Sequence, residues 1–295
     1  MRLGIDLGGT KTEIIALDKG GVVALRRRMP TPKDYDLLLA ALAQLVAQTE
    51  TELGVRASIG MAIPGSESFT SNHIKNANTV YLNGKPLRQD LENLLGRPVR
   101  LANDANCFAL SEASDGAGAG ANVVFGVIAG TGVGGGIAVD GKVLNGAHGI
   151  TGEWGHIPLP ALTDEERQDR KVCYCGKFDC LETWCCGPAI AREYQRRTGR
   201  HMDVEEIAAS SGSPERAVID LTIDRFARAL ATVVNILDPD VIVMGGGLSN
   251  IERFYRELPP LVEEYGFNLG GRPRIVKNKH GDSSGVRGAA WLWPE

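Results

Sequence analysis

The sequence lacks the features of nucleic-acid-binding and exported proteins. It has 32 basic and 36 acidic residues, a net charge of −4, and no lysine- and arginine-rich block that would follow a phosphate backbone. The first residues, MRLGIDLGG, contain no apolar stretch long enough for a signal sequence. We therefore expect no nucleic acid partner and a cytoplasmic protein.

Uninterrupted apolar runs are also scarce. The segment Val123 to Val139 has seventeen residues without a charge, which is close to a membrane span. Six of these residues are glycine, and a Gly-Thr-Gly interrupts the middle. Two short buried strands around a glycine turn fit this pattern better, so we expect no membrane association.

Length and composition predict two domains of alternating strands and helices. With 295 residues, 43% of them apolar, the chain can fill two cores of ordinary size. Apolar residues at helical spacing predict helices over Asp36–Leu53 and Pro214–Leu237, and the alternation favours an α/β fold. We expect strands over Leu3–Leu7, Thr12–Leu17, Val22–Arg28, Ser58–Ile63, Val99–Ala102, Val123–Ala129, Gly135–Val139, Val241–Met244 and Arg274–Lys277.

Two segments share one plan. LGIDLGGTKTEIIALDKG and VVFGVIAGTGVGGGIAVDGK each contain a strand, a Gly-Thr turn, a second strand, and a turn of Asp, Lys and Gly. The two Gly-Thr turns lie about 120 residues apart, which favours two similar half-molecules. Two unrelated hairpins are the alternative.

The first Gly-Thr turn has the residues of an anion site. Glycines let backbone N–H groups approach an anion, and Thr10 and Lys11 add a hydroxyl and a positive charge. Asp6, beside this turn, would be costly to bury unless it faced a magnesium ion or its hydrated shell. The alternative is a glycine-rich hairpin in which Asp6 caps a local amide.

Two further strands are followed by glycines. Gly130-Thr131-Gly132 repeats the first turn, and VIVMGGG at 241–247 ends a strand just before a helix that we expect to begin at Asn250. Three such turns favour binding of nucleotide phosphates, although none matches the P-loop or the dinucleotide fingerprint.

The cysteines are clustered. CYCGKFDC places Cys173, Cys175 and Cys180 within eight residues, and His156 lies seventeen residues before the first of them. Three thiolates and one imidazole can form a closed tetrahedral zinc site, and such spacing in a cytosolic protein favours a metal over a disulfide. Free or redox-active thiols are the alternative. The remaining cysteines are interpreted as small buried apolar residues: Cys107, Cys185 and Cys186.

Carboxylates form the third candidate group. Asn103 and Asp104 follow the strand VRLA and open a helix, where capping alone can explain them. A functional interpretation places Asp104 at the carboxyl end of that strand as an acceptor of a hydroxyl proton. A zinc ion held by both segments would bring Glu153 and Glu182 together and order a polyol-binding pocket. Surface glutamates remain the alternative for each.

These motifs, in this order and over essentially the whole chain, resemble the ROK family of sugar kinases. The matching segments are DLGGTKTE at 6, PG at 64, ANDANC at 102, GTGVGGG at 130, GEWGH at 152, CYCGKFDCLE at 173, DPDVIVMGGGLSN at 238 and GVRGAA at 285. Within the family the chain most resembles bacterial fructokinases that also accept mannose, through KNANTVYLNG, CYCGK and KHGDSSGVRGAAWLWP.

The resemblance implies an actin-like, RNase H-type duplicated fold with ATP and Mg²⁺ between two domains. It implies transfer of the γ-phosphate to a hexose hydroxyl, with Asp104 as the catalytic base. The implied sugar contacts are Gly65, Asn78, Asn103, Asp104, Glu153, His156 and Glu182. The implied contacts to ATP and magnesium are Asp6, Gly8, Gly9, Thr10, Lys11, Gly130, Thr131, Gly132, Gly246 and Gly247. The implied ligands of a structural Zn²⁺ are His156, Cys173, Cys175 and Cys180.

The expected domains are residues 1–117, with a C-terminal helix at 285–295 packing back on them, and residues 118–284, which carry the zinc loop. A homodimer is implied by the resemblance. The sequence departs from the family at Asp179, where glycine is usual before the last zinc cysteine, at Tyr81, where tryptophan is common, and at WCC from 184 to 186.

Fructose is the sugar that the resemblance favours, with N-acetylglucosamine and then glucose as alternatives. Two non-enzyme functions also stay open. Family members that act as sugar-sensing regulators carry a helix-turn-helix domain before the kinase-like part, for which DLGGT at residue 6 leaves no room. A non-catalytic sugar-binding protein would not need Asp104 and three glycine turns.

Overall fold

The computed structural model describes residues 1–294, with the backbone alone at residue 282. Contacts within the chain divide it into two compact units. The first comprises residues 1–120, 136–151 and 279 onward, and the second comprises residues 121–135 and 152–278. The domain boundaries expected from the sequence remain a prediction, since these units are defined by contacts and not by independent folding. Residue 295 of the expected C-terminal helix lies outside the described residues.

The first unit is built on a five-stranded sheet in the order β3-β2-β1-β4-β7. The strands β1, β2 and β3 are antiparallel neighbours, and β4 and β7 add on the other side of β1 in parallel register. β1 and β4 are buried along almost their whole length because both of their faces are covered by helices. The bounds are Arg2–Leu7 for β1, Lys11–Leu17 for β2, Val23–Pro30 for β3, Ser58–Ile63 for β4 and Val99–Asn103 for β7.

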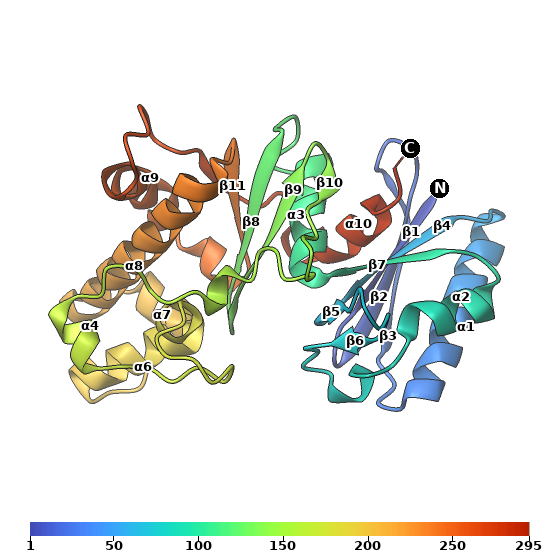
Figure 1. Ribbon diagram of the computed structural model, residues 1–295, viewed down its shortest axis with the longest axis horizontal. Coiled ribbons are helices and arrows are strands. Elements are labelled where there is room, and N and C mark those ends of the chain that lie inside the picture. Colours follow the sequence, from blue (N-terminus) through green and yellow to red (C-terminus); the bar gives the residue numbers. More distant parts are fainter. Residues whose placement is uncertain (295) are drawn as a thin grey trace. The chain divides into compact units, whose positions relative to one another are not determined.

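Helices cover both faces of this sheet (Figure 1). On one face lie α1 (Tyr35–Leu53) and α2 (Leu87–Leu95), and on the other lie α3 (Asp104–Ser114) and α10 (Ser284–Trp291). Asp34 caps α1 by accepting the N–H groups of residues 36 and 37, and Gly54 ends it in a left-handed conformation. The helix α10 returns from the far end of the sequence and buries Val286 and Ala290 against β2.

Short elements complete the first unit. β5 (Ser66–Glu67) pairs with β6 (Ile74–Lys75), a single 3-10 turn spans Val80–Leu82, and another spans Gly281–Ser283. They form the loops after β4 and before α10.

The second sheet repeats the topology of the first. Its order is β10-β9-β8-β11-β12, where β10 pairs antiparallel with β9, and β11 and β12 add in parallel beyond β8. The division between the two units runs through β9. The repeated order confirms the predicted α/β class and the predicted duplication. The bounds are Val123–Ala129 for β8, Val133–Val139 for β9, Lys142–Val143 for β10, Val241–Gly245 for β11 and Ile275–Lys277 for β12.

The long helix α8 is the main helix of the second unit. It buries Phe226 and Leu230 in the core, and its buried Arg225 and Arg228 pair with the carboxylate of Glu166 on α4. Bidentate arginine pairing lets these charges stay inside the unit. The helix bounds are Asp164–Gln168 for α4, Glu182–Cys185 for α5, Gly187–Thr198 for α6, Val204–Ala209 for α7, Ser213–Leu237 for α8 and Arg253–Tyr265 for α9, with 3-10 turns at Trp154–His156 and Gly247–Asn250.

Most predicted elements are found within one or two residues of their predicted ends, with two corrections. The C-terminal helix expected at 285–295 ends at Trp291, because Pro294 disfavours a helical conformation in the residue before it. The helix expected to begin at Asn250 begins at Arg253, because residues 247–250 form a separate 3-10 turn. The Ser249 hydroxyl donates to the Gly246 carbonyl oxygen at 2.7 Å and closes that turn. Among the described residues no helix is long and apolar enough to cross a membrane, and Val123 to Val139 forms β8, a glycine turn and β9.

Candidate active site and metal centre

The first glycine turn joins β1 to β2. Asp6 lies near the end of β1, residues 8–10 form the turn, and Lys11 begins β2. Gly8 N–H donates to the Lys11 carbonyl at 3.1 Å. Thr31 donates its N–H to the carbonyl of Thr10 and its hydroxyl to the carbonyl of Gly8. The backbone of the turn is thus held by a threonine directly after β3, which sequence reasoning missed because it lies about twenty residues away.

The negative charge of Asp104 acts on Asp6. Burial raises the pKa of Asp6 to about 6, and the negative charges of Asp104 and Glu13 add to this, against a smaller opposing effect of Lys11. Burial also raises the pKa of Asp104, although its outer surface stays open to solvent, while hydrogen bonds from the Ala105 N–H and Asn103 act in the opposite direction. Two carboxylates with raised pKa values, of which Asp6 is half-buried and Asp104 reaches solvent, are typical of a site that receives a cation or a proton.

Asn103, at the end of β7, both caps a helix and contacts a neighbouring loop. Its Oδ1 accepts the Ala105 N–H at 2.9 Å and caps α3, as the sequence suggests, while its Nδ2 donates to the Gly65 carbonyl at 3.0 Å. The amide therefore ties the start of α3 to the loop after β4. Three predicted sugar contacts, Gly65, Asn103 and Asp104, are brought together by this one side chain.

Asn78 is the fourth sugar contact predicted in this unit. It is exposed and lies on the loop that follows β6. Asn83 fixes this loop: its Oδ1 accepts the Ala77 N–H and its Nδ2 donates to the Ala77 carbonyl, both at 2.9 Å. The hydroxyl of Thr79 lies 3.5 Å from where a β-carbon on Gly9 would stand, so the loop lies against the first glycine turn. No local sequence pattern identified Thr79 or Asn83.

The second glycine turn, residues 130–132, joins β8 to β9 in the same position of the second sheet. Gly130 N–H donates to the Gly132 carbonyl at 2.9 Å. Gly246, at the end of β11, has φ of +77°, and a β-carbon there would overlap the Ala129 carbonyl. The glycines at 246–247 thus lie directly beside the Gly-Thr-Gly turn.

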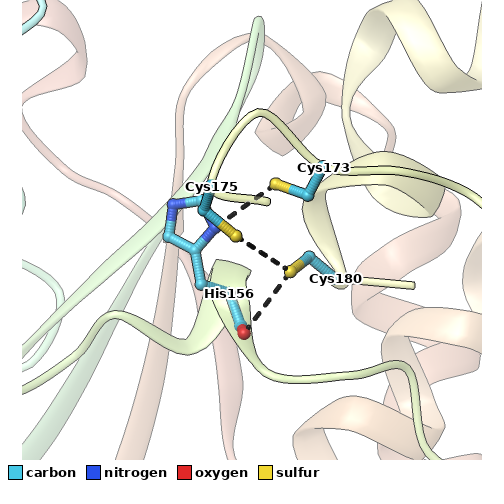
Figure 2. Close-up of side chains that lie close together, drawn as sticks. All are labelled: His156, Cys173, Cys175 and Cys180. Carbon is cyan, nitrogen blue, oxygen red and sulfur yellow. Dashed lines mark hydrogen bonds between the residues drawn. The ribbon is translucent and has the colours of Figure 1, made fainter. Parts of the chain in front are cut away.

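Four predicted metal ligands converge in the second unit. The ligand atoms of His156, Cys173, Cys175 and Cys180 all lie within 4.8 Å of one another. Figure 2 shows the three sulfur atoms gathered beside the imidazole ring; Cys173 Sγ lies 3.6 Å from His156 Nδ1, and Cys175 Sγ lies 3.6 Å from Cys180 Sγ. These four residues can hold a metal ion.

The spacing fits a zinc-type tetrahedron better than redox chemistry. Sulfur and nitrogen ligands about 2.0 to 2.3 Å from a central ion lie about 3.5 to 3.8 Å from each other, which agrees with the observed pairs. A disulfide would need about 2.05 Å between the sulfur atoms, and in the described residues all six cysteines are free. Cys107, Cys185 and Cys186 are buried, as predicted, and lie outside the cluster, so their thiols do not compete for the ion.

Asp179, the departure from the family pattern, has a simple structural explanation. Its φ is +60°, the conformation in which glycine is favoured and which aspartate tolerates. Its buried carboxylate accepts the Lys171 N–H at 2.8 Å and pairs with the Arg170 guanidinium at 2.6 Å. The backbone of the metal loop therefore keeps the shape a glycine would give it.

Glu153 and Glu182 both act electrostatically on Tyr174 of the metal loop, while their predicted approach to each other stays a prediction. Although Tyr174 is 83% exposed, desolvation by its neighbours raises the pKa of its hydroxyl, and the charges of Glu182 and, more weakly, Glu153 act in the same direction. The hydroxyl oxygen of Tyr174 lies 3.0 Å from Nε2 of His156, whose other ring nitrogen, Nδ1, faces Cys173. Tyr174 can therefore orient the imidazole. Glu153 is exposed, whereas one oxygen of Glu182 accepts the Val133 N–H at 2.9 Å.

The predicted residues thus form two groups, one in each unit. Asp6, the first glycine turn, Gly65, Asn78, Asn103 and Asp104 belong to the first unit. The second glycine turn, the glycines at 246–247, Glu153, Glu182 and the metal cluster belong to the second.

Comparison with known proteins identifies the family of the chain. The ROK family profile matches residues 2–295. N-acetyl-D-glucosamine kinase of Pectobacterium atrosepticum is 40% identical over 299 residues, covering 99% of this chain and 98% of that protein. The protein of the same name from Escherichia coli O127:H6 is also 40% identical, covering 99% of both.

Solved structures give the same family. The ROK hexokinase from Thermus thermophilus is 32% identical with a TM-score of 0.86, covering 99% of this chain and 97% of that chain. A ROK glucokinase from Streptomyces griseus, solved with glucose and AMPPNP, is 24% identical with a TM-score of 0.77, covering 99% and 98%, and supports the fold alone. These matches confirm the predicted actin-like, RNase H-type fold, and the chain belongs to the ROK family.

Proposed function

We propose that this protein is an ATP-dependent hexose kinase that transfers the γ-phosphate of ATP to a sugar hydroxyl. The observation that carries the proposal is that Asp6, beside the first glycine turn, has its pKa raised by burial and by the negative charge of Asp104. Strand ends with glycine turns suit phosphate binding, and paired carboxylates supply both a site for a divalent cation and a base.

Asp104 is the proposed catalytic base. Its carboxylate takes the proton of the sugar hydroxyl as the hydroxyl oxygen bonds to the γ-phosphorus, while the bond from that phosphorus to the bridging oxygen breaks and ADP leaves. A base works best when its pKa lies close to the working pH, and burial moves the pKa of Asp104 in that direction. The Ala105 N–H, at 2.8 Å from Oδ1, fixes the orientation of the carboxylate.

Asp6 is the proposed contact of the magnesium ion or of its bound water. The pKa of Asp6, raised to about 6 by burial and by neighbouring carboxylates, indicates negative charge that the protein itself leaves uncompensated. When bound, Mg²⁺ would neutralise charge that develops on the phosphates. Lys11 and the N–H groups of residues 8–10 are proposed to contact the phosphates in the first unit, and residues 130–132 and 246–247 to bind the nucleotide in the second.

Zinc is the proposed occupant of the four-residue cluster, with a structural role. Three thiolates and one imidazole leave no open position for substrate at a tetrahedral ion. The cluster joins the turn that carries Glu153 and His156 to the segment that carries Glu182. These two carboxylates are proposed to hydrogen-bond sugar hydroxyls, together with His156, Gly65, Asn78 and Asn103. Free thiols at such a cluster also suit a cytoplasmic protein.

N-acetylglucosamine is the proposed preferred sugar, because the relatives that are 40% identical over the whole chain carry that activity in their names. Fructose, which the segment KNANTVYLNG favours by resemblance, is the second candidate. Contacts in the sugar pocket decide between hexoses, and differences of a few hydrogen bonds change selectivity by orders of magnitude.

A coupled assay of ADP release with magnesium-ATP tests both levels of the proposal. N-acetylglucosamine, fructose, mannose and glucose are compared on the wild type and on Asp104→Asn. We expect the largest kcat/KM with N-acetylglucosamine, and loss of activity in the variant. A lead by fructose would replace the sugar and keep the mechanism. ADP release independent of every sugar would refute the kinase.

A further inference from the structure

The segment that follows the metal cluster holds the second glycine turn at two points. Glu182 accepts the Val133 N–H on its Oε2 at 2.9 Å, and the Gly187 N–H donates to the Gly130 carbonyl at 2.7 Å. Glu182 begins α5 and Gly187 begins α6. Both contacts therefore come from the few residues directly after Cys180.

These two contacts lie on either side of the turn. Gly130 is its first residue and Val133 is the residue directly after it, while the bond from Gly130 N–H to the Gly132 carbonyl spans it internally. A β-carbon on Gly132 would stand 2.5 Å from Oε2 of Glu182, so glycine there is what lets the carboxylate come so close. The position of the turn thus depends on where Glu182 is placed.

Glu182 directly follows the segment that carries the last ligand of the metal cluster. Cys180 lies two residues before it, and Leu181 N–H donates to the Ile157 carbonyl at 2.8 Å. The Cys180 thiol also lies 3.5 Å from the carbonyl oxygen of His156. A metal ion bound by His156 and Cys180 would lock the two segments in this register.

We propose that Glu182 and Gly187 transmit the order of the metal cluster to the glycine turn at 130–132, so that metal occupancy and affinity for nucleotide phosphates are coupled. The proposal rests on the proposed function for the phosphate role of this turn. Glu182 is then a positioning residue for the nucleotide, in addition to any contact with sugar. Because coupling between two ligands is reciprocal, a bound nucleotide would also tighten the metal.

Hydrogen exchange tests the physical link without any substrate. Peptides covering residues 129–134 are compared in zinc-loaded wild type, chelated wild type, Glu182→Ala and Glu182→Gln. Loss of a hydrogen bond to a carboxylate corresponds to a fold-change on the order of ten, so we expect about tenfold faster exchange at Val133 after chelation and in Glu182→Ala. Glu182→Gln keeps an acceptor and should stay close to the wild type.

The turn at residues 8–10 is the internal control, because it occupies the same place in the first sheet and the cluster contributes no residue to it. Its exchange should not change in any of these samples. Equal protection of residues 129–134 in loaded, chelated and Glu182→Ala protein would overturn the proposal. Glu182→Ala keeps all four cluster residues, so a general loss of structure after chelation would not obscure its result.

Nucleotide binding in the absence of sugar tests the proposed coupling between metal occupancy and nucleotide affinity. Calorimetric titration with magnesium-AMPPNP should show affinity about tenfold weaker for chelated protein and for Glu182→Ala than for wild type. Glu165→Ala, which changes an exposed glutamate of α4, is the matched control and should bind like the wild type. Weaker sugar binding with unchanged nucleotide binding would overturn the coupling. A wild type that binds no nucleotide at all would instead refute the proposed function. The hydrogen-exchange experiment would still decide whether the metal cluster orders the turn at 130–132.

A double-mutant cycle tests the contact between Gly132 and Glu182 independently. Gly132→Ala places a methyl group against Glu182, so it should raise exchange at Val133 in the wild-type background. It should have little further effect in Glu182→Ala, where the carboxylate is absent. Additive effects would contradict a direct contact between the two positions.

Discussion

Replacing Asp6 by asparagine should stabilise the protein while abolishing its activity. The pKa of Asp6 is raised from 3.8 to about 6, chiefly by burial and then by the charge of Asp104. The folded state therefore binds a proton more tightly than the unfolded state does. For this group stability is greatest below pH 4 and is lost as the pH rises towards 6.

The magnitude follows from the shift. Each pKa unit corresponds to 1.36 kcal/mol, so at pH 7 ionised Asp6 lowers the free energy of unfolding by about 3 kcal/mol. Asparagine has the same shape and no charge to ionise. The difference between Asp6→Asn and wild type should therefore be near zero around pH 4 and rise to about 3 kcal/mol by pH 7.

Denaturant unfolding in magnesium-free buffer, at a series of pH values, measures the difference in free energy of unfolding between Asp6→Asn and wild type. Other titrating groups are common to both proteins and largely cancel. Asp36→Asn, an exposed change in the first turn of α1, controls for the substitution itself and should give no comparable rise with pH. Asp104→Asn should move the Asp6 transition to lower pH, because it removes a neighbouring negative charge. A difference between Asp6→Asn and wild type that is the same at pH 4 and pH 7 would refute the reasoning.

Three further predictions follow from the site. Asp104→Asn should fold normally and lose on the order of 100-fold or more in kcat, since the proton acceptor is gone; steady-state kinetics and circular dichroism check both halves, and near-normal turnover would refute the role. Metal analysis should find about one zinc ion per chain, lost on chelation together with thermal stability; an active preparation free of zinc would contradict this. Asp179→Ala should lower the free energy of unfolding by about 2 kcal/mol, because alanine is strained at φ of +60° and cannot accept from Lys171 N–H. Asp179→Gly should be milder, and a larger loss for glycine than for alanine would contradict the strain argument.

The homodimer implied by family resemblance remains a prediction. Light scattering on the purified protein should give a mass of two chains, and the mass of a single chain would contradict it.

Local features of the site could be predicted from the sequence because their physical causes are local. Asn103 caps α3 through the Ala105 N–H, two residues away, and the spacing of Cys173, Cys175 and Cys180 already limits how far the thiols can separate. The glycine turns follow the strands that their apolar runs predicted. The same short-range logic identified the duplication, which the two sheets then repeat strand by strand.

Residues that act across long sequence distances could not be found in this way. Thr31, directly after β3, supports the first glycine turn by donating to the carbonyl of Gly8, 23 residues away. Asn83 is closer to its partner, since it holds the backbone of Ala77, six residues before it, through a pair of hydrogen bonds. Neither has a motif, because any polar side chain at the right place in space can do this. The contact between Glu182 and Val133 spans 49 residues and depends on the folded metal loop. The sugar itself is equally hidden, since it is chosen by contacts that one sequence does not display.

Identifying the phosphorylated product tests the central claim most directly. Wild-type protein is incubated with magnesium-ATP and N-acetylglucosamine, and mass spectrometry follows the sugar while ADP is measured in parallel. We predict a sugar heavier by one phosphoryl group in amounts equal to ADP, and no such product with Asp104→Asn. Unmodified sugar together with ADP and an equal amount of inorganic phosphate would contradict the account for this sugar. The same result with fructose, mannose and glucose would contradict the sugar kinase itself.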